Sequence, residues 1–234
     1  MNFSYYGHSC FCIEIDGCRL LFDPFISGNE LTKNKVDVDA IEADYILVSH
    51  GHQDHILDTV AIANRTGAKV ICAWEVMEWL HQQGLNNIHP MNTGGERTFE
   101  NFTVKCTVAQ HSSSMPDGSY GGNPMGFIIS TAKGSLHYAG DTALTLDMQL
   151  IPLWCRNLKA VILPIGDNFT MGYQDAVKAA DFMQCDNVIA VHFDTFDYIK
   201  VDHEIVRNTF AQSGKSIYFP LIGETIDVIA NFNN

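Results

Sequence analysis

Residues 48–55 have the sequence VSHGHQDH and follow directly on the apolar residues 45–47. This pattern predicts a short buried strand (45–48) that ends in a polar loop. The loop carries four residues that can bind metals: His50, His52, Asp54 and His55. In an extended segment, residues two apart project to the same side, so His50 and His52 can hold one ion. Asp54 and His55 lie where the chain turns and can reach a second ion. The stretch therefore predicts a metal site at a strand end.

Three further candidate ligands stand at the ends of other predicted strands, where they would face the same rim as the first cluster. They are His111, Asp141 and His192. The other histidines, apart from His8, fit packed or solvated positions better. They are His81 in a predicted helix, His137 in the middle of a strand, His89 before Pro90 in a turn, and His203 at a helix start.

The ligand types indicate which metals to expect. Imidazole and carboxylate suit Zn, Mn, Fe or Ni, whereas Mg and Ca prefer mostly oxygen ligands. Two ions about 3.5 to 4 Å apart that share a hydroxide accelerate the hydrolysis of esters and phosphoesters, because they hold both the attacked and the leaving oxygen. We therefore expect two divalent metal ions (Zn, Mn, Ni or Fe) as cofactors of a hydrolase.

The rest of the chain predicts an α/β fold with two halves of the same kind. In the first half we expect strands at residues 3–6, 10–15, 18–22, 45–48 and 69–73, and helices at about 56–65 and 75–83. In the second half we expect strands at 102–109, 125–130 and 135–139, then alternating strands and helices through 160–164, 173–183, 187–191, 203–212 and 216–219. No linker or charge run divides the chain, which predicts a single domain over residues 1–234. The outline is consistent with a four-layer αββα sandwich, although periodicity alone does not distinguish it from other α/β layer folds.

Composition and charge limit the partners. The chain is 46% hydrophobic, and its 27 acidic residues against 14 Lys and Arg give a net charge of −13. The basic residues are spread singly, so a small-molecule substrate is favoured over nucleic acid. No run of about 18 apolar residues predicts a membrane helix, and the first residues lack the pattern of a signal peptide. Seven scattered cysteines without a CxxC pair indicate reduced thiols and a cytoplasmic location. A homo-oligomer stays open.

In their order along the chain, these motifs resemble those of the metallo-β-lactamase superfamily. After SHGHQDH, a later lone histidine, AGD and VHFDTF occupy the places of its metal motifs. The resemblance is strongest to small bacterial UPF0173 metal-dependent hydrolases, relatives of the ascorbate-6-phosphate lactonase group. It extends over nearly the whole chain through YYGHSCF, LLFDPFISGN, HPMNTGG, HSSS, YGGNPMGF, HYAGDTAL and LPIGDNFTMG. It implies the αββα metallo-β-lactamase fold, with the site at the sheet edges.

The resemblance also implies a role for each candidate ligand. It assigns His50, His52 and His111 to a first metal. It assigns Asp54, His55 and His192 to a second metal, and Asp141 would bridge the two. A hydroxide that bridges the two metals would then be the nucleophile. Asp54 would orient this hydroxide, which makes Asp54 a catalytic residue as well as a ligand.

Two departures from the family pattern bear on the substrate. After His192 the chain has DTFD (194–197), where the family usually has Asn-Thr-Phe-Pro, and Asp167 stands where a small residue is usual. The added carboxylates would disfavour a strongly anionic group nearby. Asp194 is therefore a candidate for substrate binding. Asn123 is another, because it lies in the polar loop 112–124, which either closes over a bound molecule or is a passive surface loop.

Several residues near the motifs have two interpretations. His8 is a candidate catalytic residue that donates a proton to the leaving group, or a turn residue bonded to backbone. Asp23 either orients a metal-bound histidine or forms an Asp-Pro turn. In FTMG (169–172) we expect the threonine to cap a helix and its apolar neighbours to pack in the core. Trp74 and Trp79 are likewise expected in core or edge positions.

The predicted function is hydrolysis of a small-molecule ester, lactone or phosphodiester by a metal-bridging hydroxide. The alternative is a metal-dependent nuclease that acts on short nucleic acid. The excess of acidic over basic residues argues against this alternative. Electron transfer, as in the flavodiiron proteins that resemble this fold, fits poorly, because His52 stands where they carry Glu and no flavin domain is predicted. A non-catalytic scaffold also fits poorly, since all the candidate ligands are present. Thiolester and β-lactam hydrolysis stay open.

Overall fold

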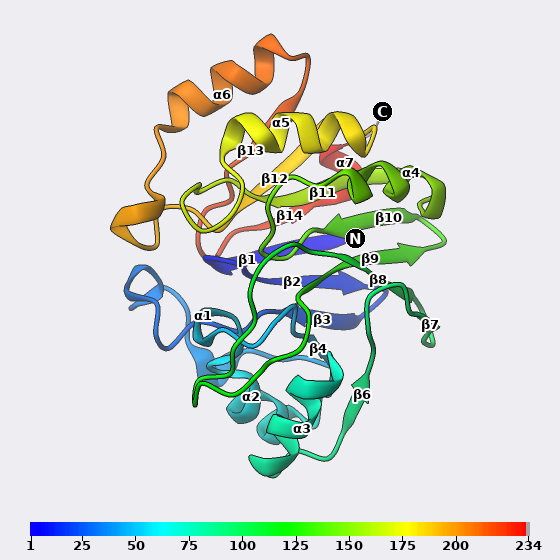
Figure 1. The fold of residues 1–234 in the computed structure, drawn as a ribbon, viewed down its shortest axis with the longest axis vertical. Coiled ribbons are helices and arrows are strands. Elements are labelled where there is room, and N and C mark those ends of the chain that lie inside the picture. The colour runs from blue at the N-terminus through cyan, green and yellow to red at the C-terminus, as the bar shows by residue number, and fades with distance from the viewer. Residues whose placement is uncertain (233–234) are drawn as a thin grey trace.

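The computed structural model describes residues 1–232, which form two seven-stranded β-sheets (Figure 1). The first sheet has the strand order β14-β1-β2-β3-β4-β5-β6, and the second has the order β13-β12-β11-β10-β9-β8-β7. The strands of the first sheet are β1 (Asn2–Gly7), β2 (Cys10–Ile15), β3 (Cys18–Phe22), β4 (Tyr45–Leu47), β5 (Lys69–Cys72), β6 (Ile88–Pro90) and β14 (Thr225–Asp227). The strands of the second are β7 (Glu96–Thr98), β8 (Thr103–Val108), β9 (Met125–Thr131), β10 (Gly134–Tyr138), β11 (Leu158–Pro164), β12 (Asn187–Val191) and β13 (Ser216–Tyr218).

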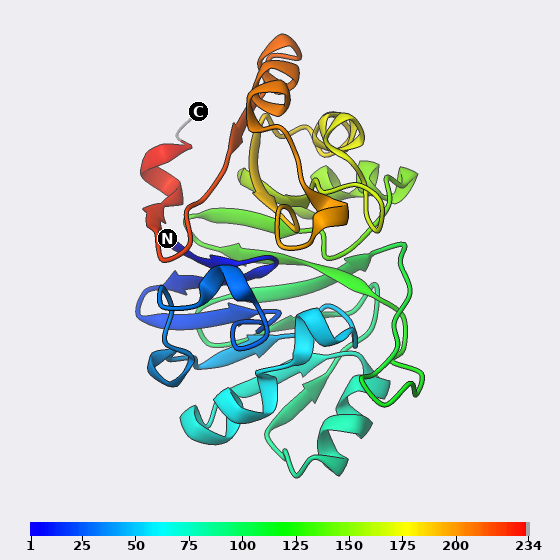
Figure 2. The same ribbon diagram turned by 90° about the vertical axis from the view of Figure 1, so that its left-hand side faces the viewer.

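Helices cover the outer face of each sheet, so that the molecule has the layers α, β, β and α (Figures 1 and 2). The helices are α1 (Gln53–Ile56), α2 (Thr59–Thr66), α3 (Trp74–Gln82), α4 (Ile151–Trp154), α5 (Tyr173–Phe182), α6 (His203–Gln212) and α7 (Val228–Asn231). Short 3-10 helices are η1 (Glu30–Thr32), η2 (Val38–Ala40), η3 (Leu146–Leu150) and η4 (Asp197–Ile199). The predicted four-layer αββα sandwich is confirmed.

Both sheets change direction in the same way. Strands β1, β2 and β3 pair antiparallel, and β3 to β6 then run parallel. In the second sheet β7 to β10 pair antiparallel, and β10 to β13 run parallel. Hairpins can connect antiparallel strands, whereas parallel strands need a crossover segment. The predicted likeness of the two halves is therefore present in the topology, and the two halves share one core between the sheets. That residues 1–234 form a single domain stays a prediction.

An aromatic cluster fills the space between the two sheets. The rings of Phe11 and Phe22 in the first sheet stack with centroids 4.6 Å apart, and Tyr138 of β10 packs edge-on against Phe11 at 5.0 Å. Phe127 of β9 meets Phe22 at 6.2 Å. All four side chains are buried. Buried aromatic residues contribute large apolar areas, so this cluster holds the two sheets together.

The structure corrects several local predictions. The expected helix at 56–65 is divided into α1 and α2, because the backbone amide of Asp58 donates to the carbonyl of Pro24 (3.0 Å) and not to a carbonyl one helical turn earlier. His89 lies in strand β6 and not in a turn; Pro90 is tolerated there because β6 is at the edge of its sheet.

Two further predictions concerned side chains. Thr170 does not cap α5, whose N-cap is Gly172 and receives no side-chain hydrogen bond. Trp74 is 54% exposed at the start of α3, so it lies neither in the core nor in an edge strand, and its predicted placement was wrong. A sequence pattern reports whether a position is apolar, but not whether another element happens to cover it. None of the helices in the described part of the chain is long and apolar enough to cross a membrane.

Candidate metal centre

The predicted ligands come together at one edge of the two sheets, where their strands end. His50 and His52 follow β4, and His52 is also the N-cap of α1, whose first residues include Asp54. The other ligands follow strands or lie in α1: His55 in α1, His111 after β8, Asp141 after β10 and His192 after β12. Ligand atoms within 4.8 Å of one another form three groups: His50, His52 and His111; His50, His55 and Asp141; and His8, Asp54, His55 and His192.

Asp141 lies at the centre of this arrangement. Its Oδ2 is 3.0 Å from Nε2 of His192, 3.2 Å from Nε2 of His55 and 3.7 Å from Nε2 of His111. Burial alone would raise the pKa of Asp141, but the imidazoles of His192 and His55 hold it well below its usual range. Asp141 is therefore a carboxylate that faces histidines of both predicted sites.

Unpaired polar atoms indicate that the cluster is built for cations. Among the described residues, the buried atoms without a hydrogen-bond partner include Nε2 of His55 and Oδ1 of Asp141. Such atoms are costly in a folded protein unless something satisfies them. Burial, with the neighbouring His55, lowers the pKa of His50, and burial also lowers the pKa values of His52 and His111. Imidazoles beside carboxylates are ligands that suit Zn, Mn, Fe or Ni.

Asp23 holds one of these histidines in place. Its Oδ2 accepts hydrogen bonds from Nδ1 of His55 (2.8 Å), from the Tyr138 hydroxyl (2.6 Å) and from Oγ of Ser49 (2.6 Å). Its Oδ1 accepts a bond from the backbone amide of Ser49 at 2.7 Å. Carboxylates in this position fix the tautomer and orientation of a ligating imidazole. Of the two interpretations of Asp23, the structure favours the one in which it orients a candidate metal ligand.

His8 is buried behind the ligands. It adopts a left-handed backbone conformation (φ 56°) in the turn between β1 and β2. Its ring lies between two partners, with Nε2 3.1 Å from Oδ2 of Asp54 and Nδ1 2.9 Å from Oγ1 of Thr195. Burial, followed by the nearby His192, lowers the pKa of His8 to about 4. His8 thus contacts Asp54 rather than the open side of the site, and its role as proton donor stays a prediction.

Comparisons with known proteins agree with this geometry. A family profile described as a Beta-lactamase superfamily domain matches residues 18–193. A UPF0173 metal-dependent hydrolase from Christiangramia forsetii is 48% identical over 228 residues, covering 97% of this chain and 100% of the relative. The chain belongs to the UPF0173 family. Another UPF0173 metal-dependent hydrolase, from Methylacidiphilum infernorum, is 49% identical over 210 residues, 90% of this chain and 92% of the relative.

A solved structure extends the match to three dimensions. Igni18, a metallo hydrolase from the archaeon Ignicoccus hospitalis, is similar with a TM-score of 0.86 and 31% sequence identity, over 96% of this chain and 97% of that chain. This UPF0173 protein is therefore a metal-dependent hydrolase of the metallo-β-lactamase superfamily, with a His and Asp cluster that can bind metal.

A cavity of about 240 Å³ opens over the ligands of this UPF0173 hydrolase. Its lining consists of His52, Asp54, His111, Ser112, Asp141, Phe169, His192 and Phe196. Sequence reasoning missed the two aromatic residues and placed Phe169 in the core, whereas it is 51% exposed. The reason lies in the loop before α5, where Asp167 (φ 60°) and Asn168 (φ 56°) turn Phe169 outward. Met171 is buried as predicted. For Phe196, an aromatic residue four positions after His192 in the loop that follows β12 was the signal available.

The two predicted substrate contacts lie outside the lining of this cavity. Asp194 accepts hydrogen bonds from Nε2 of His203 (2.7 Å) and from the backbone amide of Val201 (3.0 Å). Asn123 is exposed, and its side-chain oxygen accepts a bond from the Tyr120 hydroxyl at 3.2 Å. Both side chains are engaged locally, and their contact with a substrate stays a prediction.

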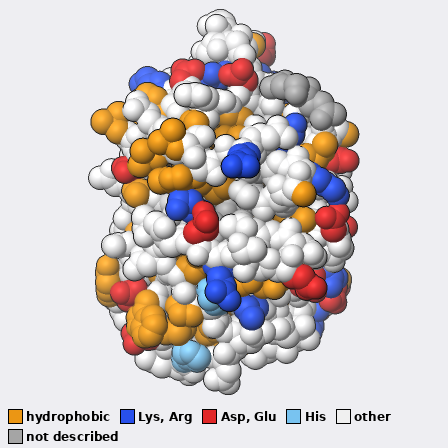
Figure 3. Space-filling model, turned by 90° about the vertical axis from the view of Figure 1, so that its right-hand side faces the viewer, with side chains coloured by type: hydrophobic (Ala, Val, Ile, Leu, Met, Phe, Trp, Pro, Cys, Tyr) orange, Lys and Arg blue, Asp and Glu red, His pale blue; other side chains and the backbone are white. Residues whose placement is uncertain are grey.

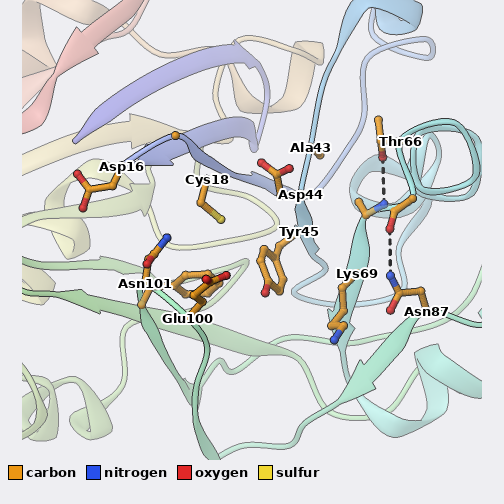
Figure 4. Close-up of a pocket in the computed structure, with 14 residues that line it drawn as sticks. Asp16, Cys18, Ala43, Asp44, Tyr45, Thr66, Lys69, Asn87, Glu100 and Asn101 are labelled. Atoms are coloured by element: carbon orange, nitrogen blue, oxygen red, sulfur yellow. Dashed lines mark hydrogen bonds between the residues drawn. The ribbon is translucent and has the colours of Figure 1, made fainter.

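A larger hollow of about 520 Å³ lies at the starts of β3, β4 and β5, the opposite ends of these strands from the ligands (Figure 4). Tyr45 stands in it between Cys18 and Lys69. Two of its carboxylates are already paired, Asp44 with Arg19 (3.2 Å) and Asp16 with Lys133 (2.5 Å). In the described part of the chain no histidine lines this hollow, so size alone does not make it the functional site of the UPF0173 hydrolase.

Proposed function

We propose that the protein hydrolyses a small-molecule ester, lactone or phosphodiester with the help of two divalent metal ions. The observation that carries this proposal is the arrangement of two ligand groups around the single carboxylate of Asp141. In the proposal, one ion is held by His50, His52 and His111, and the other by Asp54, His55 and His192. When bound, two such ions would make hydroxide available at neutral pH and would polarise the scissile bond.

The protein residues have defined tasks in this proposal. Asp54 is half-buried and lines the cavity, so its carboxylate can accept a hydrogen bond from the attacking water and orient it. Burial alone would raise the pKa of Asp54, but His55 and His8 lower it, so Asp54 acts as an acceptor. The ring of His8 lies 3.1 Å from Oδ2 of Asp54, so in this proposal His8 holds the carboxylate in the orientation that the attacking water requires.

The nuclease alternative has less support. Among the residues that the structure describes, no Lys or Arg lines the cavity over the ligands. On the face of the molecule in Figure 3, Lys and Arg side chains are scattered among Asp and Glu and form no stripe. Binding to a nucleic-acid backbone relies on clustered basic residues. A small substrate is therefore the better proposal for this site.

The cysteines bear on the compartment. All seven thiols are free, and five of them are buried in the described residues. Disulfides persist in oxidising compartments, whereas free thiols are typical of reducing ones. We propose the cytoplasm as the location for this reason.

Turnover by reconstituted protein tests the function. Protein freed of metal and then loaded with Zn, Mn, Ni or Fe is assayed on a generic phosphodiester beside a simple lactone, with bound metal counted in parallel. We expect two metals per chain and hydrolysis of one substrate class, lost in Asp54→Ala. Loaded protein that binds two metals but leaves both substrate classes, and simple carboxylic esters, intact would contradict the proposal.

A further inference from the structure

Two phenylalanines form the apolar wall of the cavity over the ligands. Phe169 comes from the loop between β11 and α5, and Phe196 from the loop after β12 (Figures 1 and 2). Phe169 is 51% exposed and Phe196 38% exposed. Apolar rings left open at the mouth of a cavity mark a surface that another molecule covers. The ligand atoms below them are polar, so the cavity has a polar floor and an aromatic wall.

Neighbouring contacts hold both rings in place. The Phe196 ring packs edge-on against the buried ring of His8, with centroids 5.4 Å apart, and the Phe169 ring packs against Tyr198 at 6.1 Å. The loop that carries Phe169 is closed by a bridge between Gly166 and Gly172. A wall that is already ordered loses little conformational entropy when a molecule binds to it. The rings are therefore suited to hold a flat apolar group.

The charges around the wall are unfavourable for an anion. No Lys or Arg of residues 1–232 lines the cavity, and Lys200 on the loop after β12 is paired with Asp197 at 2.6 Å. Asp194 on the same loop lies outside the cavity lining and is engaged with His203, whereas the carboxylates of Asp54 and Asp141 line the cavity. An anionic group that binds away from the scissile bond would meet rings and carboxylates, without a cation to offset its loss of hydration.

We propose that the substrate carries an uncharged aromatic or similarly flat apolar group beside its scissile ester or lactone bond, and that Phe169 and Phe196 bind this group. The inference rests on the proposed hydrolase function and narrows its substrate class. The cavity of about 240 Å³ is smaller than the 300 Å³ or so at which ligand pockets usually begin, which favours a single ring.

Matched esters test the proposal on the metal-loaded protein. Phenyl acetate is compared with ethyl acetate, which lacks the ring, and with 4-acetoxybenzenesulfonate, which has the ring and a distant charge. In each reaction water adds to the acyl carbon, the bond to the alcohol or phenol oxygen breaks, and that oxygen takes up a proton. After correction for the reactivity of each ester toward hydroxide, we expect kcat/KM to favour phenyl acetate over both others by about ten-fold or more.

Variants test whether the two rings cause this preference. Phe169→Ala and Phe196→Ala are each expected to lower kcat/KM for phenyl acetate about five- to ten-fold more than kcat/KM for ethyl acetate, mainly through KM. Phe169→Arg is expected to shift the preference toward the sulfonate. The matched control is Leu221→Ala, because Leu221 is 71% exposed and lies outside the cavity lining; it is expected to change nothing.

A binding measurement separates this inference from the proposed function. Acetanilide and 4-acetamidobenzenesulfonate are the unreactive amide counterparts of the two aryl esters, and their binding is measured by calorimetry. Acetanilide that binds more tightly than the sulfonate, and loses affinity in Phe169→Ala, supports the aromatic site even if no ester is hydrolysed. Equal binding of the two amides, or binding that neither phenylalanine variant alters, would overturn the inference even if esters are hydrolysed.

Discussion

Replacing Asp23 with asparagine is expected to weaken metal binding more than it weakens the fold. The Asp23 carboxylate accepts four hydrogen bonds, and one comes from Nδ1 of His55. An asparagine can keep its oxygen toward the Ser49 amide, but its NH₂ group then faces Nδ1 of His55. Without metal, His55 can respond by moving its proton to Nε2, so that Nδ1 accepts a bond from the asparagine.

With metal bound through Nε2, that change of tautomer is not available, and two donors face each other. An unsatisfied buried donor costs about 1 to 3 kcal/mol, and loss of such a partner lowers metal affinity about 10- to 100-fold. Because the penalty falls mainly on the metal-bound state, the second site should release its ion first. Competition with a coloured chelator, which reads the affinity of each ion, measures the effect.

Asp58→Asn is the matched control for this prediction. Asp58 is a buried carboxylate that also accepts several hydrogen bonds, but its partners are the amides of Ile26 and Ser27 and the Ser27 hydroxyl. It should lower the melting temperature and leave metal affinity unchanged. Equal metal affinity in Asp23→Asn and the wild type, with both ions bound, would refute the tautomer argument.

Three further predictions concern stability. Burial lowers the pKa of His137 to about 3, so between pH 6.5 and 3 the unfolded chain binds a proton that the folded chain does not, and stability falls as the pH falls. The wild type should therefore lose about 2 kcal/mol more unfolding free energy from pH 7 to pH 5 than His137→Gln does. Urea unfolding at the two pH values measures this difference. Phe22→Ala should cost about 3 to 5 kcal/mol of unfolding free energy, because Phe22 contacts rings of both sheets. Metal removal should lower the melting temperature of the wild type. At a free metal concentration 100 times Kd, bound metal adds about 2.7 kcal/mol to the free energy of unfolding. Calorimetry that finds the same melting temperature with and without metal would contradict metal binding to the folded state.

The metal cluster and the layer order could be predicted because both depend on local patterns. His50 and His52 are two residues apart at the end of an apolar run. The ends of strands that run in the same direction within a sheet lie along the same edge of that sheet. Strand β12 was predicted with its observed bounds, Asn187–Val191, since four consecutive apolar residues follow Asn187. Short edge strands such as β7 and β14 have three residues each, too few for a period to show.

Contacts between distant segments could not be predicted. His8 meets Thr195, 187 residues further along the chain, and Tyr138 meets Asp23 across the space between the sheets. The exposure of Phe169 depends on two left-handed residues before it, a backbone feature that neither Asp167 nor Asn168 requires by its type alone. These are the features that separate a list of ligands from a shaped site.

The pairing of β14 with β1 has a consequence for synthesis of the chain. Asn2, Phe3 and Ser4 of β1 pair with Asp227, Ile226 and Thr225, so β1 leaves the ribosome long before its partner strand is synthesised. Until then that border of the first sheet has unpaired backbone groups that can recruit a strand from a neighbouring nascent chain. A fusion or truncation that delays the arrival of residues 225–227 should therefore lower the yield of soluble protein before it affects any residue of the metal centre.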